Sequence, residues 1–349
     1  MTSDRLLDVD YLTPDELANC RSRGWGDVLG IALYAGDDAQ LDMAEVPVAR
    51  VTTRPLGGVP ALCEVWRAAG PLTTGRVGLV QYRAGRQLAF GCVTLAEAKA
   101  GGIVADGAAL REAATRAYAD VFRCLKMLGF ERAIRIWNYL PEINREVGGI
   151  ERYRLFNEAR QCAFQSASYN LRGNVPAACA LGSPAGSPLV VYFLAGADPG
   201  AAIENPRQLA AYDYPAEYGA CSPTFSRATL ANAVSGPMLF VSGTASIVGH
   251  RTVHVGDVIS QTRETMANIR ALVAEANRVA GGEPFAPGRL KYKAYVRRPG
   301  DLAAVAAEIT AAVHPAGPVV YLNADVCRED LLVEIEAVGG AGPGKPRRW

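Results

Sequence analysis

Two glutamates near the C-terminus are the side chains whose setting best suits acid chemistry. Glu334 and Glu336 lie in the run 331–338, where alternate residues fall on opposite faces of a predicted strand. A solvated strand face, the usual setting of a strand glutamate, would account for both. A partly dehydrated carboxyl group on a rigid strand would instead stay protonated near neutral pH and act as a general acid.

A polar break before this strand contains a cysteine. Residues 319–338 predict a strand, a tight turn at 325–330 and a second strand. Cys327 lies in the turn, next to the charged run Arg328-Glu329-Asp330. This setting is more polar than a buried structural cysteine favours. Cys327 is therefore either an inert turn residue or a functional thiol.

Length and charge limit the class of protein. The chain has 349 residues, of which half are hydrophobic and a fifth charged, and its net charge is +1. It can bury a large core, and its length predicts two domains. The near-neutral charge gives no electrostatic reason to bind nucleic acid or an anionic membrane. No apolar run could span a bilayer and the polar N-terminus lacks a signal-peptide pattern, so we expect a cytoplasmic protein.

The cysteines and histidines do not form a recognisable metal or disulfide pattern. The eight cysteines are scattered singly, without a Cys-x-x-Cys pair, and there are three histidines. His250 and His254 have i, i+4 spacing, but they lie in a predicted loop or strand and lack a third ligand. We expect reduced cysteines, no disulfide framework and no structural zinc site.

Residues 1 to about 45 are polar and irregular, with 29–34 as a candidate first short strand, and the pattern of regular elements sharpens from residue 47. Glycine and proline turns separate strands at 48–53, 61–67, 76–82 and 87–94. A helix at 108–128 has an apolar stripe and ends at Gly129. A strand at 133–140, a helix at 150–164 and a strand pair at 177–194 follow.

Residues 236–338 repeat that order of elements. They predict a strand at 237–249, a helix from Asp257 or Ser260 to 280, a strand at 290–297, a helix at 302–313 and the final strand pair. A repeat of this length indicates a duplicated domain. The predicted fold class is α+β, with two tandem units that each place two helices on one face of a mixed sheet. The predicted units are 1–195 and 236–349, joined by a linker at 196–235.

The repeat also bears on the two glutamates. Aligning 189–193 with 332–336 places Glu334 opposite Val191 and Glu336 opposite Phe193. A merely solvated face would be polar in both units, so the contrast favours a functional Glu334.

Each unit resembles the YjgF/RidA family. The likeness rests on Ser242-Gly243-Thr244, on the strand 293–297 and on Leu332-Val333-Glu334-Ile335-Glu336-Ala337. The arginine that the RidA deaminases place ahead of the final strand pair would fall near Val320, which cannot bind a carboxylate. This departure disfavours imine hydrolysis.

The whole chain, from about residue 25 onwards, is similar to the chorismatases. The likeness rests on four separated stretches, namely Trp137–Asn144, Glu151–Arg160, Asn205–Pro215 and Cys327–Glu336. The resemblance implies that chorismate is cleaved to pyruvate and a cyclic product without a cofactor. It implies that Glu334 protonates the methylene carbon of the enolpyruvyl ether.

The resemblance also bears on the product. A cysteine at the position of Cys327 marks the branch that forms 3-hydroxybenzoate, whereas a small inert residue marks the branch that adds water and forms 3,4-dihydroxycyclohexa-1,5-dienoate. The sequence therefore favours 3-hydroxybenzoate, with Gly243 and Ala245 as further residues of the same region. The dienoate-forming hydrolase and a non-catalytic or imine-hydrolysing YjgF-type protein are the alternatives.

Chorismate has two carboxylates, for which arginine is the preferred partner. Arg160 and Tyr153 share one face of the helix at 150–164 and are candidates, whereas we expect Arg152 and Arg154 to face solvent. Arg297, at a strand end, fits a solvated or a binding role equally well.

The remaining candidates come from the linker and from a strand. Tyr212 lies in the linker, which could lie over the cleft. Thr244 lies beside Gly243, where the backbone and the substrate could come close, and it could donate a hydrogen bond. Trp137 and Tyr139 suit the core better than the site. Because two fused units could replace the family's trimer, we expect a monomer.

Overall fold

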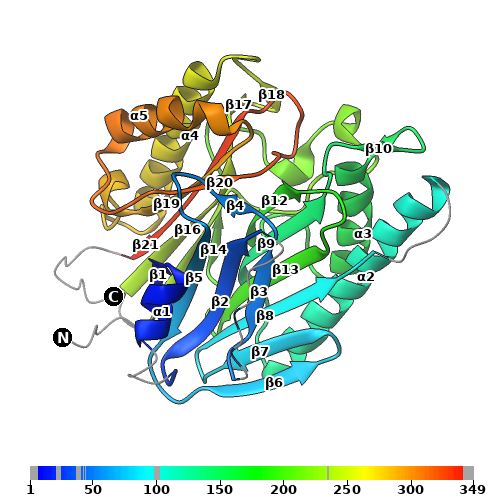
Figure 1. The fold of residues 1–349 in the computed structure, drawn as a ribbon, viewed down its shortest axis with the longest axis vertical. Helices are drawn as coiled ribbons and strands as arrows, with labels where there is room; N and C mark the ends of the chain where they lie inside the picture. Colours follow the sequence, from blue (N-terminus) through cyan, green and yellow to red (C-terminus); the bar gives the residue numbers. More distant parts are fainter. Residues whose placement is uncertain are drawn as a thin grey trace.

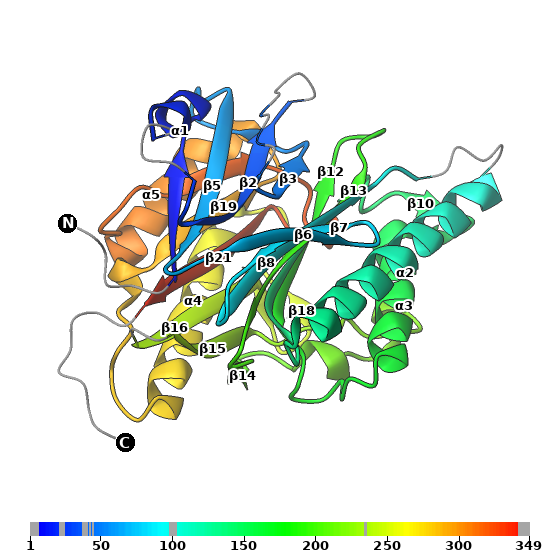
Figure 2. The same cartoon turned by 90° about the horizontal axis from the view of Figure 1, so that it is seen from below.

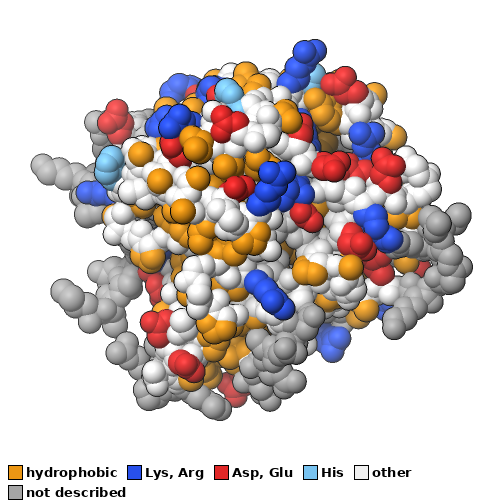
Figure 3. Space-filling model, turned by 45° about the horizontal axis from the view of Figure 1, so that its top comes forward, with side chains coloured by type: hydrophobic (Ala, Val, Ile, Leu, Met, Phe, Trp, Pro, Cys, Tyr) orange, Lys and Arg blue, Asp and Glu red, His pale blue; other side chains and the backbone are white. Residues whose placement is uncertain are grey.

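Three larger sheets surround a common core, and helices cover the outer faces of two of them (Figures 1 and 2). The computed structural model describes residues 7–20, 25–36, 41, 43, 45–97, 103–233 and 236–340. Within the described residues, no helix is long and apolar enough to cross a membrane. On the face seen in Figure 3, acidic and basic side chains are interspersed among hydrophobic ones.

The first sheet is formed by the N-terminal strands in the order β1-β5-β2-β3. Its elements are β1 (Leu7–Leu12), α1 (Pro14–Cys20), β2 (Val28–Ala35), β3 (Val48–Val51) and β5 (Ala61–Ala68). The candidate strand at 29–34 is present as β2, whereas the prediction that the rest of the first 45 residues is irregular is wrong for β1 and α1. β1 is half-buried and pairs along its length with β5. The six residues of β1 are too short a pattern to predict a strand by themselves, and their strand structure depends on pairing with β5, which lies far away in the sequence.

The second sheet has the order β12-β9-β13-β8-β7-β6, with two helices on its outer face. Its strands are β6 (Thr73–Val77), β7 (Val80–Ala84), β8 (Leu88–Leu95), β9 (Ala133–Pro141), β12 (Ala177–Ser183) and β13 (Leu189–Gly196), and its helices are α2 (Ile103–Leu128) and α3 (Arg152–Ser166). The apolar stripe of α2 is buried, and Gly129, at φ +77°, ends the helix as predicted. The strand predicted at 76–82 is the hairpin of β6 and β7.

The third sheet has the order β14-β15-β16-β21-β19-β20-β4, and α4 and α5 cover it in the same way. Its elements are β4 (Arg54–Pro55), β14 (Ala201–Ile203), β15 (Ala228–Ala233), β16 (Gly236–Thr244), α4 (Val258–Val279), β19 (Lys291–Val296), α5 (Leu302–Val313), β20 (Val320–Asn323) and β21 (Val333–Gly340). Asp257 caps α4 by accepting hydrogen bonds from the backbone of Ile259 and Ser260. The predicted α+β fold of two tandem units is confirmed.

Short elements complete the chain. Two hairpins join β10 (Glu146–Val147) to β11 (Ile150–Glu151) and β17 (Ile247–Val248) to β18 (Arg251–Thr252), and 3-10 turns lie at Ala211–Asp213, Ala216–Tyr218, Pro287–Arg289 and Pro299–Asp301. Strands of the predicted linker, β14 and β15, extend the third sheet, and β4 joins its other edge. The division at residues 195 and 236 stays a prediction.

The predicted turn between the last two strands is not a hairpin. β20 pairs in parallel with β19, and β21 pairs antiparallel with the other edge of β19. The segment 324–332 therefore crosses the end of the sheet. A sequence pattern of strand, polar break and strand cannot distinguish this crossing from a hairpin, because the intervening strand comes earlier in the chain.

The faces of β21 separate its glutamates from its apolar residues, as predicted. Val333, Ile335 and Ala337 pack beneath the helices of the third sheet. Glu334 and Glu336 lie on the opposite face, toward the core that the three sheets share.

The predicted counterparts of these glutamates in the second sheet are wrong by one residue. Val191 and Phe193 pack beneath α2 and α3, whereas Tyr192 and Leu194 face the shared core. A slip of one residue along a strand exchanges its faces, so the glutamates correspond to Tyr192 and Leu194. The contrast between the units remains, because neither counterpart carries a carboxyl group.

Close approach of the first and second sheets depends on Gly30 in β2. A Cβ at this position would overlap the buried ring of Phe90, which is stacked on Tyr192. We expect Gly30→Ala to lower the free energy of unfolding by about 1–3 kcal/mol through overpacking, measured by denaturant titration. Gly26→Ala, which adds a Cβ where nothing lies within 4 Å, is the matched control. Equal losses in both variants would contradict the packing argument.

Candidate active site

One cavity of about 300 Å³ brings together residues from α3, the predicted linker, β16 and the final strands. Glu334, Cys327, Gly243, Ala245 and Tyr153 line it, so five of the predicted site residues meet there. A cavity of this size suits one small molecule.

Glu334 is a carboxyl group held in a dehydrated position on β21. Its side chain is 3% exposed, and among the described residues no hydrogen bond to its carboxyl oxygens is found. Burial raises the pKa of Glu334 to about 8, with a further contribution from the charge of Glu336, although Arg135 and Arg227 oppose the shift. The carboxyl group is therefore largely protonated at neutral pH and can donate a proton.

Gly243 provides the space that this carboxyl group occupies. A Cβ at position 243 would overlap Oε1 of Glu334 and lie 3.0 Å from Cβ of Cys179. The position therefore needs glycine for steric reasons rather than for its backbone angles. Thr244 turns away from the cavity wall and donates a hydrogen bond to the Ser242 carbonyl at 2.8 Å.

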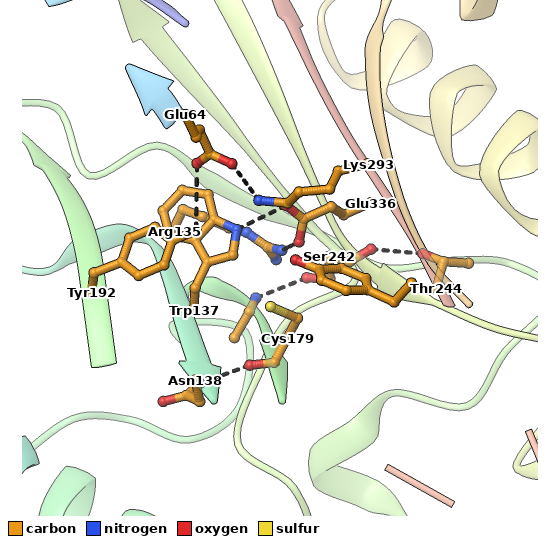
Figure 4. Close-up of polar contacts among 12 residues, drawn as sticks. Glu64, Arg135, Trp137, Asn138, Cys179, Tyr192, Ser242, Thr244, Lys293 and Glu336 are labelled. Atoms are coloured by element: carbon orange, nitrogen blue, oxygen red, sulfur yellow. Dashed lines mark hydrogen bonds and ion pairs between the residues drawn. The ribbon is translucent and has the colours of Figure 1, made fainter. Parts of the chain in front are cut away.

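Glu336 has a different environment, although it lies only two residues from Glu334. Figure 4 shows it among Arg135, Trp137 and Lys293. Its carboxylate accepts hydrogen bonds from Arg135 at 2.6 Å and from the Trp137 indole at 2.9 Å, and lies 2.8 Å from Lys293 Nζ. Burial disfavours its charge, but Lys293 and Arg135 outweigh that effect and lower the pKa of Glu336. Glu336, unassigned from the sequence, is thus an ionised partner in a buried network.

Cys327 lies on the cavity wall as a neutral thiol. It packs against the small cluster of Ala245, Ile247, Val326 and Leu331. Burial, followed by the charge of Glu334, raises the pKa of Cys327 to about 12. At neutral pH this residue can shape the cavity and donate a weak hydrogen bond, but it is not a thiolate nucleophile.

Three arginines line the cavity that were not selected from the sequence. Arg227 donates to the Tyr214 hydroxyl at 2.8 Å, and Arg328 stacks on the Tyr218 ring at 4.1 Å. Arg154 also lines the cavity, and its side chain is 42% exposed, which agrees with the expectation of a solvated side chain. Arg152, expected on the same solvated face, is instead buried and donates to the Pro141 carbonyl.

Aromatic residues in the predicted linker could have indicated from the sequence that arginines bind there. Tyr214, Tyr218 and Phe225 line the cavity and stack with Arg227 or Arg328. Tyr212, the candidate taken from the linker, packs against the core of the second sheet and does not line the cavity.

Two predicted arginines lie outside the cavity lining. The Arg297 guanidinium binds Asp325, Asn144 and the carbonyls of Leu331, Val326 and Arg328. It therefore holds the segment 325–331 in place rather than offering free donors to a substrate. Arg160 is buried over the Tyr118 ring at 5.5 Å, and its Nε and Nη2 have no hydrogen-bond partner among the described residues.

The two spaced histidines do not share a site. His250 contacts the Tyr218 hydroxyl at 3.2 Å, and His254 lies 3.3 Å from Glu264. No cluster of three or more potential metal ligands occurs in the part of the chain that the structure describes.

A neutral carboxyl group and arginines around a small cavity are typical of an enzyme that protonates a small anionic molecule. Residues 64–195 match the family described as chorismatase FkbO/Hyg5-like, N-terminal. A 3-hydroxybenzoate synthase of Streptomyces hygroscopicus is 41% identical over 237 residues, which cover 65% of this chain and 69% of that protein. A chorismatase of the same organism is 35% identical over 283 residues, covering 80% of this chain and 79% of that protein.

A solved structure agrees with these sequence relatives. A crystal structure of a chorismatase matches with a TM-score of 0.84 and 29% identity, over 97% of this chain and 99% of that one. The chain belongs to the chorismatase family. The resemblance inferred from the sequence is confirmed.

The protonation state of Glu334 can be measured without a substrate. We expect the carboxyl band in the infrared difference spectrum between the protein and Glu334→Gln to disappear as the pH rises through about 8. The sign follows from burial, which favours the neutral form and moves the titration upward from the ordinary range. Glu308→Gln, which alters a glutamate paired with Arg263 at the surface, is the control. Loss of the Glu334 band below pH 6 would contradict this description of the site.

Proposed function

We propose that the protein cleaves chorismate to pyruvate and 3-hydroxybenzoate, with Glu334 as the acid. The observation that carries the proposal is the neutral Glu334 carboxyl group on the cavity wall, next to Cys327. The relative named 3-hydroxybenzoate synthase, at 41% identity, supports the product. Chorismate has the atoms of pyruvate and 3-hydroxybenzoate combined, so the reaction needs neither water nor a redox partner.

In this mechanism Glu334 donates its proton to the methylene carbon of the enolpyruvyl ether. The adjacent ether carbon gains oxocarbenium character, and the ring hydroxyl of the substrate takes part in the breakage of the ether bond as the ring becomes aromatic. The Glu334 carboxylate then regains a proton as the ring loses one. A cavity of about 300 Å³ lined by Phe225, Tyr214 and Ala245 would limit the access of water to the cation.

Arginines around the cavity suit the two carboxylates of chorismate. Arg227 and Arg328 are held in place by tyrosine contacts and face the same cavity as Glu334. Arg160 has buried donors without partners and acts electrostatically on Tyr153, which lines the cavity. We assign carboxylate binding to Arg227 and Arg328, and retain Arg160 with Tyr153 as a second contact.

The protein would act as a cytoplasmic monomer without a metal or organic cofactor. The three sheets of one chain already enclose a shared core, which supports a monomer. Light scattering coupled to gel filtration measures the oligomeric state.

A direct assay tests the function. Purified protein is incubated with chorismate, and the products are followed by coupled pyruvate detection and by chromatography with ultraviolet absorbance. Equal amounts of pyruvate and 3-hydroxybenzoate are expected. Absence of pyruvate would overturn the proposal, and pyruvate with a non-aromatic diene would replace the product by 3,4-dihydroxycyclohexa-1,5-dienoate.

Removal of the proton donor should abolish turnover. We expect Glu334→Gln to bind chorismate but to lose at least about 10²–10⁴-fold in kcat, because the amide is a far weaker acid than the carboxyl group. In the wild type, kcat/KM should fall as the pH rises through about 8, where the acid loses its proton. Calorimetry and steady-state kinetics measure binding and turnover separately, and substantial turnover by the variant would remove Glu334 from its role.

Cys327 should influence the product more than the rate. We expect Cys327→Ala to change the ratio of 3-hydroxybenzoate to the dienoate while the rate of pyruvate release changes less, since the neutral thiol shapes the wall beside Glu334. Product ratios from chromatography check this, with Cys162→Ala on the exposed surface of α3 as control. An unchanged ratio would show that Cys327 does not direct the product.

A further inference from the structure

Two carboxyl groups on one face of β21 have opposite environments. Glu334 and Glu336 lie about 7 Å apart along the strand, as alternate residues do. Glu336 has partners from two neighbouring strands, Arg135 and Trp137 on β9 and Lys293 on β19. Glu334 has space and no hydrogen-bond partner among the described residues. The contrast suggests a division of labour between a fixed charge and a proton donor.

We propose that Glu336 is a positioning residue for the reaction, a fixed negative charge that Arg135 and Lys293 hold in place and that keeps the neighbouring Glu334 carboxyl protonated. The inference rests on the proposed function of Glu334 as the acid. Glu336 itself does not line the cavity and transfers no proton.

Lys293, which stabilises the charge of Glu336, is itself held in place by residues of the first sheet. Lys293 is buried, forms an ion pair with Glu64 on β5, and donates to the Tyr34 hydroxyl at 2.7 Å. Trp66 donates to Glu64 at 2.8 Å. Lys293 is thus shared between two carboxylates. Because burial disfavours its charge less than Glu336 and Glu64 favour it, the pKa of Lys293 is raised and the side chain stays cationic.

The titratable groups around Glu334 come from several elements. Glu336 on β21, Arg135 on β9 and Arg227 before β15 act on it as charges. Further titratable groups line the same cavity, namely Glu151, Arg154, Tyr214, Tyr218, Arg328, Glu329 and Asp330. Three more groups act on or face Glu334, namely Cys179 on β12, Cys327 after β20 and Tyr153 on α3. Burial raises the pKa of each of these three, so all are neutral at the pH of interest. Of the carboxylates named here, Glu336 is the one whose charge raises the pKa of Glu334.

A purely structural role is the alternative, in which the ion pairs of Glu336 only join the second and third sheets. Both roles predict a loss of stability when Glu336 is replaced, because Arg135 and Lys293 lose a partner. Only the proposed role predicts that the pH dependence of catalysis moves.

The test measures kcat/KM against pH for Glu336→Gln and for the wild type, and compares the pH at which kcat/KM falls on the alkaline side, here called the alkaline limb. Removal of the negative charge, which leaves Arg135 less compensated, makes ionisation of Glu334 easier. The limb should therefore move to lower pH by about one unit or more. Activity at neutral pH falls with it, and activity at lower pH recovers toward that of the wild type. A limb that stays in place or moves upward overturns the proposal.

A second variant predicts the opposite direction. Arg135→Gln removes a positive charge that favours ionised Glu334, while Lys293 still holds Glu336 ionised. Its alkaline limb should move to higher pH. If Glu336→Gln does not fold, as judged by circular dichroism and thermal melting, this variant carries the test, and a limb that does not move upward overturns the proposal.

Glu64→Gln is the matched control for loss of a buried carboxylate. Glu64 belongs to the same network but lies beyond Lys293, on the first sheet. We expect lower thermal stability with an alkaline limb close to that of the wild type. A shift as large as that of Glu336→Gln would attribute the effect to the whole network and overturn a specific role for Glu336.

An infrared titration separates failure of this inference from failure of the proposed function. The carboxyl band of Glu334 is followed in the presence and absence of Glu336→Gln, each referenced to Glu334→Gln in the same background. A downward shift of the Glu334 titration supports the role of Glu336 even when no pyruvate is released. If the wild type cleaves chorismate and the band does not shift, the function stands and the role of Glu336 is overturned.

Discussion

The structure depends on four charges buried where its three sheets meet. Glu64 comes from the first sheet, Arg135 from the second, and Lys293 and Glu336 from the third, and none is more than 6% exposed. A buried charge without its partner costs several kcal/mol, so the sheets can associate only in the register that brings all four together. Tyrosine hydroxyls from the three sheets complete the network, with Tyr34 contacting Tyr192 at 2.6 Å and Tyr139 contacting Tyr295 at 2.7 Å.

That register also determines the environment of Glu334. Since side chains alternate along β21, a strand that directs Glu336 into the network must direct Glu334 to the same side, one pleat closer to the end of the sheet. There the facing residue is Gly243 rather than a cation, and the carboxyl group has space but little water. The chemistry of the two glutamates thus differs because of their neighbours and not because of their type.

Patterns that depend on nearby residues allowed most of the fold to be predicted. The apolar stripe of α2, the Asp257 cap of α4 and the alternation of β21 are each specified within a few residues, and the structure has them. The features that were missed depend on residues far apart in the chain. β1 becomes a strand through β5, and β19 separates the last two strands. The slip that paired Glu334 with Val191 has the same origin, because similarity between two apolar strands does not fix which face is buried against helices.

The site shows the same distinction. Glu334, Cys327, Gly243, Ala245 and Tyr153 were selected through sequence motifs and all line the cavity. Arg154, Arg227 and Arg328 were missed, because the sequence around an arginine does not show whether its side chain will face a cavity or open solvent. The interactions of Arg297 with the segment 325–331 likewise follow only from the crossing of that segment over the sheet.

The arginines connect substrate binding to the state of the acid. Arg227 favours ionisation of Glu334 and so opposes the protonated form. A substrate with two carboxylates would neutralise Arg227 and Arg328 and would bring negative charge close to Glu334, and both effects favour its protonated form. Under the proposed mechanism, the negative charge of the bound substrate would therefore help to keep Glu334 protonated and able to donate its proton. Burial raises the pKa of Glu334 most, and the fixed charge of Glu336 acts in the same direction, so a cavity lined by cations can still hold a neutral carboxylic acid.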